Sequence, residues 1–180
     1  PVIYAGQGIH YAKDWKELKE LAEQRNIPVT TSIEGKSAFP EDHPLSLGSG
    51  GRANSRPVKR YLEESDLILG LGVSFALTAF GVPMPPGKKI IHATLDPMDL
   101  NKDVPADIGL IGDAKLTLAA LNSELSNADN SKAAARANEP EKINELKEEW
   151  MQEWLPKLTN NEAPINLSLI HISEPTRRST

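Results

Sequence analysis

The chain contains no cysteine, few aromatic residues (5%) and no apolar run of membrane-spanning length. The absence of cysteine excludes disulfide bonds, thiolate catalysis and cysteine-ligated metal sites. Acidic residues outnumber basic ones by 25 to 20, and no basic stripe offsets the net charge of −5. This balance argues against nucleic acid or an anionic membrane as a partner. The first residues do not form a signal peptide, so we expect a cytoplasmic protein.

What is present is the composition of an ordinary globular protein, with 39% hydrophobic and 25% charged residues. A length of 180 residues is enough for one substantial α/β domain plus an appendage. The chain begins inside an apolar segment, PVIYAG, without an initiator methionine. We therefore expect it to be a piece of a longer protein.

Five short apolar segments rich in β-branched residues are typical of buried strands. They are continuous rather than alternating, as expected for strands that are covered on both faces. Segments with helical periodicity separate several of them, which indicates βαβ units. The sequence therefore predicts an α/β fold with a doubly wound, mostly parallel, Rossmann-like sheet and helices on both faces. The strand segments are residues 2–5, 27–33, 66–73, 88–95 and 106–112.

Helices are expected over residues 14–25, 56–65 and 112–125, where apolar side chains recur at helical spacing. Asp14 with Glu17 three residues later predicts a capping box at the start of the first of these. Asp113 is the expected N-cap of the last. This part of the chain, residues 1–126, is predicted to be one domain.

Residues 127–166 are predicted to be a linker and one amphipathic helix. The segment SNADNSKAAARANEP is small and polar, as linkers are, and the helix that follows is expected to end at Pro156. Trp150 and Trp154 lie on its apolar stripe, which favours packing onto the parent domain or its neighbour, the alternative being a partner groove. Residues 167–177 resemble one reading frame of a transposase adapter used in preparing sequencing libraries, so residues 167–180 are expected to be a non-native tail.

In an open parallel sheet, ligands bind beyond the carboxyl ends of the strands. Several predicted strands end in glycine- or hydroxyl-containing turns that could approach a pyrophosphate, among them Gly70-Leu71-Gly72 and Thr94 to Asp96. The alternative is tight strand-to-helix packing without a ligand. Neither Gly-x-Gly is a full dinucleotide fingerprint, because the third glycine position holds Tyr11 in one and Phe75 in the other. These motifs argue against a nicotinamide dehydrogenase.

Candidates for acid–base chemistry are few. His43 lies in a proline-flanked loop from which it could reach a site from above, although a solvated surface position is favoured. His10 follows the first Gly-x-Gly and could orient a ligand or occupy a helix start. His92 lies within an apolar strand, which favours a core position. The sequence shows no pattern that indicates a Ser-His-Asp catalytic triad.

Four aspartates, Asp96, Asp99, Asp103 and Asp107, resemble a carboxylate cluster for a metal ion. Their segment, LDPMDLNKDVPAD, is punctuated by proline, and in such turns aspartate usually accepts local hydrogen bonds. We therefore expect neither metal ligands nor catalytic residues in this chain.

Taken together, five segments occur in the order and spacing of one family. The chain resembles, over residues 1–126, the central domain of thiamine-diphosphate-dependent enzymes of the acetolactate synthase and pyruvate oxidase type. Residues 127–166 resemble the linker into the next domain. The segments are PVIYAGQG, GKSAFPEDHPLSLGSGG, SDLILGLGVSF, GKKIIHATLDPMDLNKD and IGDAKLTLAAL.

The resemblance implies an enzyme of three domains, a lyase or transferase that makes or breaks C–C bonds next to the carbonyl of 2-oxo acids. It implies that thiamine diphosphate and Mg²⁺ are bound by the first and third domains, which would be this chain's partners in a homodimer or homotetramer. The Gly-Asp-Gly motif for Mg²⁺ is absent here, since Gly112-Asp113-Ala114 lacks the last glycine. The fragment alone is therefore expected to be inactive. The alternatives are a non-catalytic nucleotide-binding or scaffolding domain, and an electron-transfer flavoprotein-like domain.

In flavin-binding members, the resemblance implies that this domain holds FAD; other members hold ADP or no nucleotide. This chain departs from the flavin-binding pattern, since Ser74-Phe75-Ala76-Leu77-Thr78 replaces an Arg-Phe-Asp-Asp-Arg run and Thr94 replaces an acid. The cofactor-binding residues implied are Gly6, Gln7, Gly8, Thr31, Ser32, Leu47, Gly48, Ser49, Gly50, Gly72, Val73, Ser74, Thr94, Leu95, Asp113 and Ala114.

Overall fold

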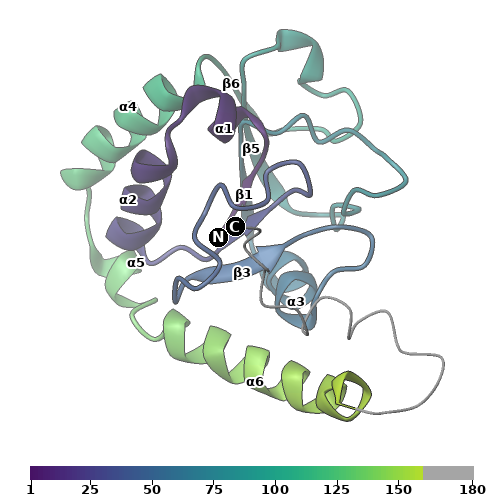
Figure 1. The fold of residues 1–180 in the computed structure, drawn as a ribbon. Helices are drawn as coiled ribbons and strands as arrows, with labels where there is room; N and C mark the ends of the chain where they lie inside the picture. The colour runs from purple at the N-terminus through teal and green to yellow at the C-terminus, as the bar shows by residue number, and fades with distance from the viewer. Residues whose placement is uncertain (160–180) are drawn as a thin grey trace, which may run out of the picture.

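A computed structural model of the chain describes residues 1–159, and the predicted non-native tail lies outside them. A six-stranded sheet, parallel throughout, runs in the order β3-β2-β1-β4-β5-β6 (Figure 1). This is the strand order of doubly wound nucleotide-binding folds, so the predicted fold class is confirmed. The strands are β1 (Val2–Ala5), β2 (Val29–Thr31), β3 (Ser46–Ser49), β4 (Leu67–Leu71), β5 (Lys89–Thr94) and β6 (Ile108–Ile111).

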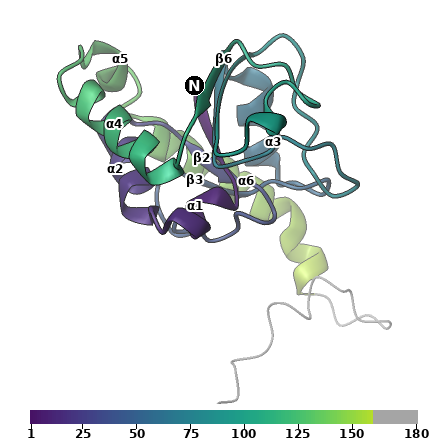
Figure 2. The same ribbon diagram turned by 90° about the horizontal axis from the view of Figure 1, so that it is seen from above.

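Helices cover both faces of the sheet (Figures 1 and 2). Helices α1, α2 and α4 lie on one face, where α2 and α4 pack side by side; α3 lies on the other face, and α6 packs against it. The helices are α1 (Gly8–Ala12), α2 (Trp15–Arg25), α3 (Arg56–Glu64), α4 (Ala114–Ser126), α5 (Ser131–Ala134) and α6 (Glu139–Leu158), with a 3₁₀ turn, η1 (Pro97–Asp99). Among residues 1–159, no helix is both long and apolar enough to cross a membrane.

The central strands form the core. Every side chain of β1 is buried, because helices pack over both of its faces, as its continuous apolar run predicted. Leu18 and Leu21 of α2 are fully buried against the sheet. Val58 and Leu62 of α3 are also buried, each with an exposed fraction of 1% or less. Burial of such side chains is the main force that holds an α/β domain together.

Strand β3 lies outside the five segments that the sequence predicts as strands. The structure pairs Ser46–Ser49 with β2, with a register shift between Val29 and Thr30. This edge strand is only four residues long and has Gly48 at φ +95°. Serine and glycine carry almost no strand signal, so the pairing is a tertiary effect.

Two predicted helix ends are also wrong. Asp14 occupies the N-cap position of α2 but its side chain accepts no capping hydrogen bond, so there is no capping box. Pro156 lies inside α6, which continues to Leu158. By contrast, Asp113 caps α4 as predicted, with its Oδ1 accepting from the N–H of Leu116 at 3.1 Å.

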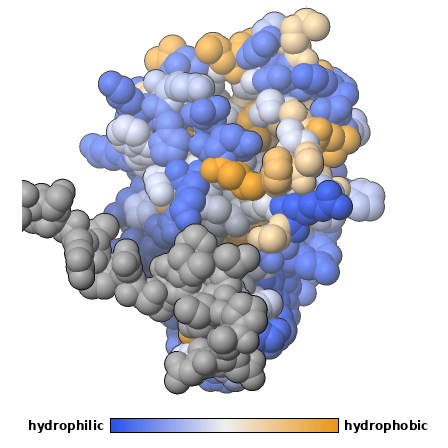
Figure 3. Space-filling model, turned by 45° about the vertical axis from the view of Figure 1, so that its right-hand side comes forward, coloured by the Kyte–Doolittle hydropathy of each residue, from blue (hydrophilic) through white to orange (hydrophobic). Residues whose placement is uncertain are grey.

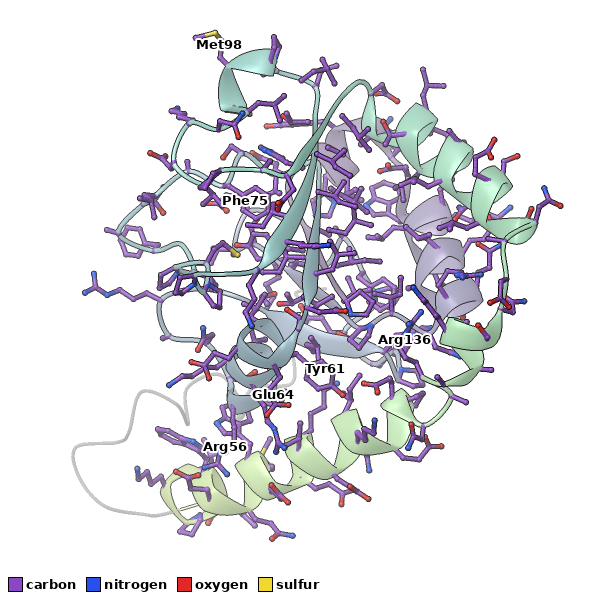
Figure 4. The ribbon with its side chains drawn as sticks, turned by 180° about the vertical axis from the view of Figure 1, so that it is seen from behind. Arg56, Tyr61, Glu64, Phe75, Met98 and Arg136 are labelled. Carbon is purple, nitrogen blue, oxygen red and sulfur yellow. The ribbon has the colours of Figure 1, made fainter. Side chains whose placement is uncertain are left out.

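Two arginines fix the segment between α4 and α6 against α2. The guanidinium of Arg25, only 7% exposed, donates to Asn130 Oδ1 at 2.7 Å, to the Asp129 carbonyl at 2.9 Å and to the Leu125 carbonyl at 3.4 Å. Arg136, labelled in Figure 4, donates in return to the carbonyl of Arg25 at 2.7 Å. The polar composition that suggested a linker therefore belongs to a segment held by hydrogen bonds.

Helix α6 packs on the parent domain, as predicted, with Ile143 and Leu146 buried. The Tyr61 hydroxyl of α3 donates to Glu139 at 2.8 Å, and Arg56 forms an ion pair with Glu153 (Figure 4). Farther along, Trp150 and Trp154 contact each other, with ring centroids 6.4 Å apart. The two tryptophans therefore lie beside each other along one side of the helix.

We predict that Arg25→Ala lowers the free energy of unfolding by about 2–4 kcal/mol, because it removes three hydrogen bonds that a buried guanidinium donates to the end of α4 and the segment that follows it. Arg60→Ala is the matched control: Arg60 is exposed and forms an ion pair with Glu64, one helical turn away. Its loss should cost about 0.5 kcal/mol or less. Urea unfolding monitored by circular dichroism measures both values. Similar losses in the two variants would show that the hydrogen bonds of Arg25 contribute no more to stability than an exposed ion pair.

Candidate functional site

A cavity of about 530 Å³ lies beyond the carboxyl ends of β1, β4, β5 and β6. The sheet order reverses between β1 and β4, so the loops that leave these two strands diverge and leave a crevice, which is where open α/β sheets bind ligands. The loops after β4 and β5 also expose Leu77, Phe80 and Met98. Figure 3 shows apolar side chains at several places on this side of the molecule.

Most of the cofactor-binding residues that were predicted line this cavity. Those that do are Gln7, Gly8, Ser32, Gly72, Val73, Ser74, Thr94, Leu95, Asp113 and Ala114. Those outside the lining are Gly6, Thr31, Leu47, Gly48, Ser49 and Gly50. Gly6 directly follows β1 and packs closely against the backbone of Gly72 and Val73. The others belong to the pairing of β2 with β3: the Thr31 hydroxyl donates to Ser49 Oγ at 3.1 Å, and Gly50 N–H donates to the Thr31 carbonyl at 2.6 Å.

Sequence reasoning missed Tyr11 and Glu34, which also line the cavity. Tyr11 is 76% exposed on the short helix α1, and Glu34 lies in the loop that leaves β2. Glu34 directly follows the predicted strand 27–33, whereas Tyr11 lies farther from any predicted strand. Both residue types are common on ordinary protein surfaces, so no local signal marks either side chain as part of a site. Only the meeting of the two loops brings these side chains to the cavity.

Glycines Gly8 and Gly72 let the turns after β1 and β4 touch each other. The Gly8 N–H donates to the Gly72 carbonyl at 2.8 Å, and the Gly6 N–H donates to the Leu71 carbonyl at 2.9 Å. A Cβ atom on Gly8 would lie 2.7 Å from Gly72 Cα, and one on Gly72, whose φ is +59°, would lie 2.9 Å from Gly8 Cα. Strand-end packing therefore requires these glycines whether or not a ligand is present.

Phe75, in the third glycine position of the second turn, fills a gap in the sheet. Tyr4, Gly70 and His92 are neighbours in register across β1, β4 and β5, and Gly70 has no side chain. The Phe75 ring occupies that space, with its centroid 5.7 Å from that of Tyr4 and 4.8 Å from that of His92 (Figure 4). Phe75 adopts the left-handed backbone angle φ +52° in this position, which is uncommon for a bulky residue. Burial of the neighbouring Tyr4 raises the pKa of its hydroxyl to about 12.

The three candidate histidines have structural partners. His10 Nε2 bonds the Lys36 carbonyl at 2.9 Å, and its Nδ1 accepts from the Trp15 indole at 2.9 Å. His92 is fully buried and bonds the Val73 carbonyl through Nε2 at 2.6 Å, as a core residue. His43 bonds Glu23 of α2 at 3.1 Å and does not line this cavity. Its side chain is only 11% exposed, so the favoured expectation of a solvated surface position is wrong.

The four aspartates of the β5–β6 segment are occupied by hydrogen bonds. Asp96 caps η1 by accepting from Met98 N–H at 2.9 Å, and Asp107 accepts from Ile90 N–H at 2.8 Å. Asp103 accepts from Leu77 N–H at 3.0 Å, which links two loops that are distant in sequence. Within the part of the chain that the structure describes, no three His, Cys, Asp or Glu side chains are placed to hold a metal ion.

The cavity is negatively charged. Four carboxylates line it, and its lining contains no lysine, arginine or histidine within residues 1–159. The carboxylates belong to Glu34, Asp96, Asp99 and Asp113. Lys115, next to the cavity in sequence, forms an ion pair with Glu17 at 3.6 Å. An anion in this cavity would meet like charge on several sides.

Comparison with known proteins identifies the family, since residues 1–121 match the thiamine pyrophosphate enzyme central domain. The chain belongs to this family. It is 35% identical over 147 residues to a probable acetolactate synthase large subunit of Methanococcus aeolicus, covering 81% of this chain and 24% of that protein. It is 41% identical over 120 residues to its counterparts in Methanocaldococcus jannaschii and Buchnera aphidicola, covering 66% of this chain and 20% and 21% of those proteins.

The contact between the two turns yields a testable difference between two glycines. Gly87 has φ +74° but open space around it, whereas Gly72 combines a positive φ with a close backbone neighbour. We predict that Gly87→Ala costs about 1 kcal/mol of unfolding free energy and Gly72→Ala about 3 kcal/mol or more. Guanidinium unfolding of both variants measures the difference. Equal costs would show that the turns can separate without loss.

Asp14 lies between α1 and α2 with a fully buried carboxylate, neither oxygen of which has a hydrogen-bond partner among the described residues. Burial, together with the negative charges of Glu17 and Asp113, raises the pKa of Asp14 to about 6. The positive charge of Lys115 opposes this rise. In the unfolded chain the carboxyl ionises near pH 4. The folded state therefore holds the proton over a pH range in which the unfolded state releases it.

We predict that stability falls as the pH rises from about 4 to about 6, by about 1–3 kcal/mol, and changes little from this cause outside that range. Asp14→Asn, which is never charged, should abolish this slope and raise the stability at pH 7. Asp42→Asn, at an exposed position, is the matched control. Unfolding midpoints measured from pH 4 to pH 8 test this, and an unchanged slope in the Asp14 variant would contradict it.

Proposed function

We propose that this chain is the central domain of an acetolactate-synthase-like enzyme that makes or breaks C–C bonds next to the carbonyl of 2-oxo acids. The observation that supports this most directly is the match of residues 1–121 to the central domain of thiamine pyrophosphate enzymes. Relatives named as acetolactate synthases are 35–41% identical over this same region. In such an enzyme, thiamine diphosphate supplies the electron sink and the protein supplies orientation.

Within that enzyme, the chain acts as a scaffold. Among residues 1–159, no histidine that could serve as a base lines its cavity, and Asp113 caps α4 rather than standing in a Gly-Asp-Gly metal motif. The glycines at the strand ends are required by packing. We therefore assign thiamine diphosphate and Mg²⁺ to other domains of a cytoplasmic homodimer or homotetramer, since the chain spans only 20–24% of the length of these relatives.

The test is to assay the intact protein and this chain side by side. The intact protein should convert pyruvate to acetolactate only with both thiamine diphosphate and Mg²⁺ present, whereas residues 1–180 alone should show no turnover. Removal of either cofactor from the intact protein is the control. Turnover by the isolated chain, or an intact protein that leaves pyruvate and other 2-oxo acids unchanged, would contradict the proposal.

A further inference from the structure

FAD is the cofactor that the resemblance implies for flavin-binding relatives, and the chemistry of the cavity tests whether it fits here. FAD carries a diphosphate, and proteins hold such groups with cationic side chains and free backbone N–H groups. The cavity instead presents the carboxylates of Glu34, Asp96, Asp99 and Asp113, with no cationic side chain among its described lining residues. The charge at this site is therefore of the wrong sign for a diphosphate.

The backbone donors are also partly consumed. In a nucleotide-binding turn, glycine N–H groups point at the phosphates. Here the Gly8 N–H donates to the Gly72 carbonyl, and the Gly72 N–H donates to the Ala93 carbonyl at 2.9 Å. Asp113 already accepts from an N–H in the first turn of α4, where an anion would otherwise find a donor. The Lys115 side chain is paired with Glu17.

The space beyond the turn after β4 is small. The neighbouring cavity along residues 73–84 measures about 70 Å³, and Tyr4 and Phe75 form part of its wall. Pockets that hold drug-sized ligands usually measure about 300–1,000 Å³, so this one leaves no room for a flavin ring. The larger cavity could enclose a nucleotide by volume, but its charge opposes the phosphates.

We propose that this chain excludes FAD and other nucleoside diphosphates by charge, so that the enzyme to which it belongs works without flavin in its central domain. The four carboxylates suit a group that donates hydrogen bonds, such as a ribose hydroxyl, and repel a phosphate. The proposal builds on family membership only in the choice of FAD as the cofactor to test. A direct binding assay examines the cavity itself, so its result is independent of whether the intact protein makes acetolactate.

The test uses isothermal titration calorimetry of the chain with FAD, ADP and adenosine. ADP should bind no more tightly than adenosine, although nucleotide sites normally gain affinity from phosphate. Raising the salt concentration should strengthen ADP binding, because salt screens repulsion as well as attraction. FAD binding with a Kd below about 10 μM, or ADP binding that exceeds adenosine binding and weakens with salt, would overturn the proposal.

A charge-neutralised variant tests the cause. Glu34→Gln, Asp96→Asn, Asp99→Asn and Asp113→Asn together should raise ADP affinity at least tenfold; asparagine also caps helices, so the fold should persist. The matched control neutralises four exposed carboxylates elsewhere, Glu20→Gln, Asp42→Asn, Glu124→Gln and Glu149→Gln, and should leave the affinity unchanged. Circular dichroism confirms that both variants fold. No gain in the cavity variant, or an equal gain in the control, would overturn the proposal.

Discussion

The close contact between the turns after β1 and β4 is the constraint on which the rest of this domain depends. Two glycine backbones touch there, and one hydrogen bond of 2.8 Å joins them. Because β1 and β4 are the neighbours at which the strand order reverses, their following segments leave toward opposite faces of the sheet. The contact therefore forms the floor of the cavity, which Gly8 and Gly72 line.

The same glycines illustrate how a nucleotide-type turn and a well-packed strand end share one sequence pattern. Gly-x-Gly allows close approach, but it does not say whether a phosphate or a second backbone makes that approach. In this chain a second backbone does so, and the neighbouring side chains are acidic. The crevice follows from the strand order, whereas its negative charge comes from four side chains that line it.

The sequence was sufficient to predict the parallel sheet, because buried central strands such as β1 and β4 are continuous apolar runs. It was insufficient for β3, whose serine and glycine residues pair only because β2 lies beside them. The carboxylate of Asp14 looked like a helix cap and is instead buried without a partner. Glu34 directly follows a predicted strand, but its residue type does not show that the side chain turns toward the cavity, as it does in the structure.

Phe75 fixes the course of the loop after β4, whereas the side chains beside it determine what that loop can contact. Its ring fills the space above Gly70 between Tyr4 and His92, so the turn after β4 is anchored from the inside of the sheet. The residues around it, such as Ser74, Leu77 and Thr78, face outward and are at least partly exposed. Mutation of the exposed Leu77 can add or remove contacts to a small molecule while the backbone keeps its course. The hydroxyls of Ser74 and Thr78, by contrast, accept hydrogen bonds from N–H groups of the same loop. A domain built this way can lose a cofactor during evolution without first losing its fold.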